Sequence, residues 1–139
     1  MMNRSDFQKL AKIRLKDVQA LLKKGCYSGA YYLAGYVVEC GLKACIAKKT
    51  RKFDFPPDRK VIDAVYIHDL TKLIKSAGLE VTFNKDLKKD EKLASYWSVL
   101  KDWTESSRYE EYDQQKAKDI YQAIADEKHE VLQWLSRRW

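Results

Sequence analysis

The chain has 139 residues, 45% hydrophobic and 34% charged, which is the size and composition of one folded globular domain over residues 1–139. A chain of this size folds without disulfides or a structural metal, and its three cysteines form no CxxC pair, so we expect no disulfide framework and no metal or cofactor. The N-terminus lacks the apolar core region of a signal peptide, and the sequence therefore predicts a cytoplasmic protein.

The net charge of +7 is distributed unevenly along the chain. Residues 1–60 contain 14 Lys and Arg against five Asp and Glu, whereas residues 61–139 contain 13 against 15. The resulting positive field of the first part suits RNA, DNA or an acidic protein as a partner. The alternative is that these lysines only solvate the outer faces of helices, because no basic run is interleaved with aromatic residues.

The first predicted helix opens with a capping box formed by Ser5 and Gln8 and ends at Gly25. Its apolar positions follow helical spacing and are Phe7, Leu10, Ala11, Val18, Leu21 and Leu22. Arg14 falls on the same stripe, where an arginine either reaches the surface or meets an acid inside. Glu39 is a candidate for that acid.

The stretch Tyr27–Lys49 is almost entirely apolar or small, with Glu39 and Lys43 in its middle. A helix that is apolar all round is either a membrane span or the buried centre of a bundle. The two charges favour the bundle, because an acid or lysine at mid-membrane costs at least about 2.5 kcal/mol. Glu39 precedes Lys43 by four residues and so predicts a structural ion pair; the alternative is a functional carboxylate in a cleft.

Residues 50–60 form a basic loop with both prolines, and a short helical turn is expected over residues 61–67. The next helix starts at His68-Asp69-Leu70, with Asp69 or His68 as its cap, and stops at Gly78. His68 at a helix start has either a capping and packing role or a catalytic one.

A fourth helix is expected over residues 86–103, capped by Asn84 or Asp86, with only a weak strand signal before it at residues 81–83. The polar segment 104–113 follows, with Arg108 and Tyr109 at its centre. A last helix starts near Asp113 and continues almost to the C-terminus, with His129 exposed. Together the pattern predicts an all-α, up-and-down bundle of four to five helices and excludes an α/β cofactor fold.

The order of short motifs along the chain resembles the HEPN domain family of prokaryotes. The motifs are LLKKGCY at 21–27, AYYLAGYVVECGLKA at 30–44, HDL at 68–70, AGL at 77–79 and SRY at 107–109. The resemblance covers nearly the whole chain and implies a helical bundle that forms a homodimer. It also implies a nucleotidyltransferase as a possible partner, with the two proteins acting as a toxin–antitoxin pair. The charges within Tyr27–Lys49, not the resemblance, predict no membrane association.

Many proteins of this family are metal-independent endoribonucleases whose active site pairs an arginine with a histidine four to six residues later. Arg108 matches the family arginine, but the residues after it read YEEYDQQKA, with no histidine. An arginine stabilises phosphate charge but does not exchange protons at neutral pH, so another group would have to do so. Tyr109, Glu110, Glu111 or His68 are the candidates.

Three hypotheses follow for this chain. In the first, a dimeric cleft lined by Arg108, Tyr109, Glu39 and His68 binds a nucleotide, RNA or a nucleotidyltransferase, with no catalysis or only residual catalysis. In the second, the protein is a ribonuclease toxin in which Arg108 is catalytic and holds the scissile phosphate. In the third it is a dimeric scaffold, and Arg108 ties its loop to Glu39.

Overall fold

The structure is a computed structural model that describes residues 2–49, 59, 63, 66–126 and 131–139. Within this part it contains seven α-helices, one 3₁₀ helix and no strand, so the all-α prediction is confirmed. In chain order the elements are α1 (Arg4–Lys23), α2 (Tyr27–Lys49), α4 (Leu70–Ser76), α5 (Glu80–Lys89), α6 (Glu91–Leu100), η1 (Glu105–Tyr109), α7 (Gln114–Ala125) and α8 (Val131–Ser136).

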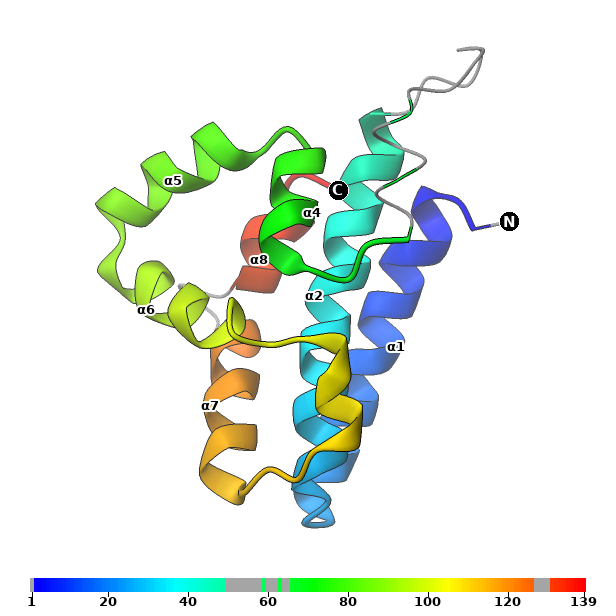
Figure 1. Ribbon diagram of the computed structural model, residues 1–139, viewed down its shortest axis with the longest axis vertical. Helices are drawn as coiled ribbons and strands as arrows, with labels where there is room; N and C mark the ends of the chain where they lie inside the picture. Colours follow the sequence, from blue (N-terminus) through cyan, green and yellow to red (C-terminus); the bar gives the residue numbers. More distant parts are fainter. Residues whose placement is uncertain (1, 50–58, 60–62, 64–65, 127–130) are drawn as a thin grey trace.

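Helix α2 is the centre of the fold. It contacts α1, α4, α7, α8 and η1, and α1 runs antiparallel beside it over most of its length (Figure 1). Nearly every α2 residue from Ala30 to Ile46 is buried, Glu39 and Lys43 included. None of the helices in the described ranges is long and apolar enough to cross a membrane. The neighbours that cover α2 therefore account for its apolar sequence, as the bundle interpretation requires.

The predicted start of the first helix was wrong by two residues. Asn3, not Ser5, is the N-cap: its side chain accepts a hydrogen bond from the Asp6 backbone N–H at 2.9 Å, and the Asp6 carboxylate accepts one from the Asn3 N–H at 2.9 Å. This reciprocal arrangement is a capping box with an aspartate at the third position. The predicted end at Gly25 is confirmed by its positive φ of 75°.

Both ends of α4 agree with the prediction. The Asp69 side chain caps it by accepting from the Lys72 backbone N–H at 3.1 Å. Gly78, with φ of 72°, follows its last turn, and the Leu79 N–H then donates back to the Ile74 carbonyl at 3.1 Å. The Asp69 cap sets where α4 begins, and His68 lies one residue before it.

The single helix expected over residues 86–103 is two helices in the structure. Asp90 ends α5 with an extended ψ of 97° and caps α6 by accepting from the backbone N–H groups of Lys92 and Leu93 at 3.1 Å. Residues 81–83, the weak strand signal, lie inside α5, and neither Asn84 nor Asp86 is a cap. The local competition for backbone donors at Asp90 thus divides what looks like one amphipathic run.

The last helix is also shorter than predicted. Helix α7 is capped by Asp113 and ends at Ala125, because Asp126 adopts an extended ψ of 119°. The Asp126 carboxylate accepts a hydrogen bond from the Tyr96 hydroxyl, which connects this turn to α6. The expectations for His129, for residues 50–58 and for most of the turn at 61–67 lie outside the described residues.

The burial of the cysteines predicts their reactivity. Cys40 and Cys45 are buried, at 1% and 3% exposed, whereas Cys26 is exposed. Burial raises the pKa of the Cys40 thiol to about 12 and the pKa of the Cys45 thiol to about 11. Only the thiolate reacts with disulfide reagents. Ellman's reagent should therefore modify one of the three thiols rapidly in the native protein and all three in denaturant. Rapid modification of two or three native thiols would contradict this burial.

Candidate functional site

The candidate site is built on the buried carboxylate of Glu39, which is 1% exposed. Lys43 Nζ lies 3.2 Å from Glu39 Oε2, at the i, i+4 spacing that the sequence indicated. On the other oxygen, His68 Nδ1 lies 3.0 Å from Glu39 Oε1. A buried charge is stable only where such groups compensate it, and Glu39 has one compensating group on each oxygen.

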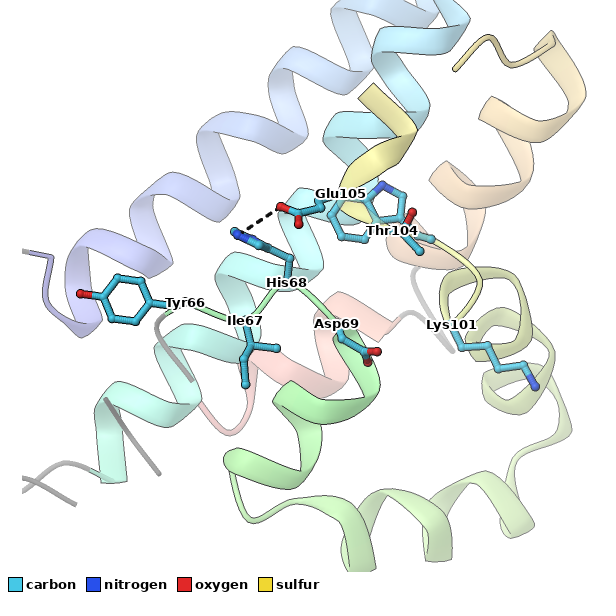
Figure 2. Close-up of a pocket in the computed structure, with 8 residues that line it drawn as sticks. Tyr66, Ile67, His68, Asp69, Lys101, Thr104 and Glu105 are labelled. Atoms are coloured by element: carbon cyan, nitrogen blue, oxygen red, sulfur yellow. Dashed lines mark ion pairs between the residues drawn. The ribbon is translucent and has the colours of Figure 1, made fainter. Parts of the chain in front are cut away.

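The two ring nitrogens of His68 face carboxylates from different elements. Nδ1 faces Glu39 of α2, and Nε2 lies 3.2 Å from Glu105 Oε2 of η1. Figure 2 shows the His68 ring and the Glu105 carboxylate turned toward each other. Glu39 is buried, whereas Glu105 is half exposed, so Glu39 orients the ring and Glu105 occupies its solvent side. The ring donates to both carboxylates at once only in its protonated form.

A surface pocket of about 300 Å³ opens beside His68 (Figure 2). Its lining comes from the segment before α4 and from the segment that runs from the end of α6 to the first residue of η1. The residues are Tyr66, Ile67, His68, Asp69, Lys101, Trp103, Thr104 and Glu105. A pocket of this size holds a single small group such as a nucleobase or a sugar phosphate.

Arg108 and Tyr109 lie on the surface of η1. The Arg108 guanidinium carbon is 4.8 Å from the centroid of the Tyr109 ring, and the Tyr109 side chain is 77% exposed. The pKa of Arg108 is raised by the nearby Tyr109 and, to a smaller extent, by Tyr32. An arginine stacked on tyrosine keeps its positive charge, which suits an anionic ligand.

The structure does not bring Arg108 or Arg14 to Glu39. Among the described residues Arg108 forms no ion pair, and Arg14 pairs instead with Asp17 at 2.7 Å. The two predicted arginine partners of Glu39 are thus replaced by His68. The reason is geometric: Arg108 lies beside Tyr32, seven residues before Glu39 on α2, and seven residues of helix span about 10 Å.

Trp103, not Arg108, anchors the segment between α6 and η1 to the central helix α2. Its ring packs against Gly35, and its indole N–H donates to the Tyr32 carbonyl at 3.2 Å. Ser107 of η1 is also buried, and its hydroxyl has no hydrogen-bond partner within the described residues. The anchored turn then presents Arg108 to solvent, so the scaffold hypothesis in which Arg108 is a structural tie is not supported.

Arg108 lies on the same side of the 3₁₀ helix η1 as Glu105, the residue that contacts His68. Residues three apart eclipse one another in a 3₁₀ helix, so Glu105 and Arg108 share one side, separated by a rise of about 6 Å. Glu105 contacts His68 and lines the pocket, whereas Arg108 lies one turn further along η1 and outside the lining. Sequence reasoning missed Glu105 and Lys101, and no motif marks either residue.

Within the described ranges, no three His, Cys, Asp or Glu side chains form a group that could hold a metal ion. The comparisons with known proteins give one finding about the family. The family model described as HEPN domain matches residues 5–139. No curated protein and no solved structure matches the chain significantly.

Proposed function

The chain belongs to the HEPN domain family, and from this premise we propose that it binds single-stranded RNA or its nucleotides at the surface formed by His68, Glu105, Arg108 and Tyr109, termed here the Arg108 surface. The family has nucleotide- and RNA-related roles, so this ligand class agrees with the family. The residues of the Arg108 surface support a specific way of binding it.

The observation that carries the proposal is the state of Arg108. Its guanidinium is exposed, forms no ion pair among the described residues, and is stacked against an exposed tyrosine. A phosphate would therefore bind it without first displacing a carboxylate, and bidentate hydrogen bonding suits the guanidinium fork. The free face of Tyr109 would stack a base, a contact worth about 1–3 kcal/mol per base.

The charge distribution supports this ligand only through the helices beside η1, because residues 102–113 carry five acidic residues against Arg108 alone. The excess of Lys and Arg over Asp and Glu in residues 1–60 belongs largely to α1 and to α2, the helix against which η1 packs. A positive field of this kind raises the rate at which a polyanion meets the protein. It gives no sequence preference, so selectivity would come from the pocket beside His68.

We expect Arg108→Ala to weaken binding of a fluorescein-labelled single-stranded RNA by about tenfold, the effect of losing one charge-assisted contact of about 1.4 kcal/mol. The slope of log Kd against log salt concentration should decrease by about 0.7, the contribution of one phosphate contact on a single strand. Tyr109→Ala should weaken binding by a similar factor with an unchanged salt slope. Fluorescence anisotropy over a range of salt concentrations measures both quantities.

The matched control for this experiment is Arg137→Ala, because Arg137 is also an exposed arginine but lies in the C-terminal segment after α8. It should leave affinity nearly unchanged. Arg108→Ala should also leave the free energy of unfolding within about 0.5 kcal/mol of the parent, since it is a surface residue. Equal losses of affinity in the two arginine variants would remove the Arg108 surface as the binding site.

A second candidate function, metal-independent RNA cleavage, is favoured by the Glu39–His68 contact. A histidine that a buried carboxylate orients on one nitrogen presents the other nitrogen for proton transfer. His68 Nε2 would take the proton of the 2′-hydroxyl as its oxygen attacks the phosphorus, and Arg108 would stabilise the charge that develops on the phosphate. The bond from phosphorus to the 5′-oxygen would break, and water would protonate the departing oxygen. For this, Glu105 would first have to release Nε2, which its exposure permits.

If this candidate is right, purified protein cleaves RNA in excess EDTA, and His68→Ala and Arg108→Ala each lower the rate by at least about a hundredfold, the usual contribution of general acid–base catalysis. An RNA with 2′-deoxy substitutions should be bound but not cleaved. Cleavage that persists in His68→Ala would exclude His68 as the proton acceptor, and cleavage that also persists in Arg108→Ala would identify a contaminating nuclease. Binding without cleavage by the parent protein would leave the first proposal standing and end the second.

A further inference from the structure

A second pocket, of about 320 Å³, opens between α4, α5 and α6. It shares no lining residue with the pocket beside His68. Its volume is at the lower end of the range for small-molecule sites, enough for a ligand of one or two rings. It combines an apolar wall with a few charged side chains, the usual composition of such sites.

The apolar wall is rigid. Phe83 is 2% exposed and is held from two sides, by Trp97 in an edge-to-face contact at 5.0 Å between centroids and by Trp134 at 4.8 Å. Ile74 of α4, 6% exposed, completes the wall. Trp97 is only half buried. A planar ring that packs here meets a surface already in place, so little ordering is required on binding.

The indole N–H of Trp97 is available to a ligand. Trp103 and Trp134 donate theirs to the Tyr32 carbonyl and to Asp86, at 3.2 and 2.8 Å. Trp97 donates to no protein group in the described part of the chain. A tryptophan N–H usually finds a partner, so the one at this pocket offers an additional polar contact.

The charges at the pocket favour an anion. Lys72 and Lys75 project from the same short helix, and in the described ranges neither pairs with a carboxylate. Glu80, the one acidic residue of the lining, forms no ion pair there either. Two lysines against one glutamate leave an excess of one positive charge beside the aromatic wall, which complements a monoanion.

We propose that this pocket binds a small planar aromatic carboxylate. The ring packs against the half-buried Trp97, which Phe83 supports from the core, and the carboxylate lies between the ammonium groups of Lys72 and Lys75. The site is independent of the Arg108 surface and of the function proposed for it.

The test is a titration of ¹⁵N-labelled protein with 2-naphthoate, followed by NMR on the four tryptophan indole N–H signals. Trp97→Phe assigns the relevant signal by its loss. We expect this signal to shift in a saturable manner. The neutral analogue 2-naphthalenemethanol should bind at least about tenfold more weakly, because it lacks the charge. No saturable shift of the Trp97 signal, or equal affinity for the neutral analogue, would overturn the proposal.

Charge variants give a second readout that does not depend on the aromatic wall. Lys72→Gln with Lys75→Gln should weaken naphthoate by about tenfold, and Glu80→Gln should tighten it several-fold, since it removes the opposing charge. The matched control is Lys85→Gln with Lys88→Gln, two exposed lysines of α5 that do not line the pocket. If the control pair weakens binding as much as the pocket pair, the affinity reflects the net charge of the protein, and this pocket is not the binding site.

Discussion

Gly35→Ala should destabilise the protein by about 3 kcal/mol or more, at the upper end of what overpacking a core costs. A Cβ atom built on Gly35 would lie 2.1 Å from the ring atoms of Trp103, far inside any real contact. Trp103 is 2% exposed and donates its indole N–H to the Tyr32 carbonyl, so the ring cannot move away without losing that hydrogen bond. The methyl group must therefore displace the whole segment that carries Trp103.

The control is another glycine of the same helix. A Cβ on Gly29 would meet Leu21 at 3.5 Å, an ordinary van der Waals contact. Replacing a glycine inside a helix by alanine removes backbone entropy from the unfolded chain, so Gly29→Ala should stabilise by about 0.5–1 kcal/mol. Urea denaturation of both variants measures the two opposite signs. A stabilised Gly35→Ala would contradict the packing of Trp103 on α2.

The same substitution tests how the site is assembled. Trp103 immediately precedes η1, which carries Glu105 and Arg108. If Gly35→Ala moves this segment, the variant should lose affinity for RNA even where enough folded protein remains to be measured. Gly29→Ala should retain full affinity. Gly35 is thus expected to affect both the stability of the protein and the placement of Arg108.

The parts of the fold that were predictable from sequence are those set by local chemistry. Gly25 and Gly78 end their helices because each adopts a positive φ that other residues rarely adopt, and Asp69 caps α4 through its own side chain. The apolar character of α2 indicated its central place. The division at Asp90 was not predictable, because Asp90 is compatible with a helix interior as well as with a cap.

The candidate site was predictable only in its components. Glu39, His68, Arg108 and Tyr109 stand out by type and spacing, but their contacts depend on how elements far apart in the chain pack. The Glu39–His68 contact joins residues 29 apart, and the Glu105–His68 contact brings η1 to the start of α4. Arg14, which shares a stripe with buried residues, pairs with its own neighbour Asp17. Helical periodicity gives the face of a residue but not its partner across the fold.

The second large effect is expected for Glu39→Leu, which should destabilise the protein by about 3 kcal/mol. The substitution removes the carboxylate that lies 3.2 Å from Lys43 Nζ and 3.0 Å from His68 Nδ1, while Lys43 stays 9% exposed. Removing one partner of a buried pair weakens the compensation of the other partner's charge. Lys43→Met should cost less, about 1–2 kcal/mol, because Glu39 keeps its contact with His68.

The double variant Glu39→Leu with Lys43→Met separates the pair from its surroundings. Replacing both charges by apolar groups of similar volume is often nearly neutral, so the double variant should be more stable than Glu39→Leu alone. The coupling energy from urea denaturation of the four proteins should be about 1–3 kcal/mol. Additive losses would mean that the two side chains contribute independently and that the 3.2 Å contact has no energetic weight.

The two single variants also distinguish the structural from the functional role of Glu39. Lys43→Met leaves Glu39 in place to orient His68, so it should lower stability but leave RNA binding, and any cleavage, unchanged. Glu39→Leu releases the His68 ring and should impair both stability and activity. If Lys43→Met abolishes activity in protein that is still folded, the lysine itself takes part in the site. If Glu39→Leu retains full activity, orientation of His68 by the buried carboxylate is not required, and Glu39 is a structural residue alone.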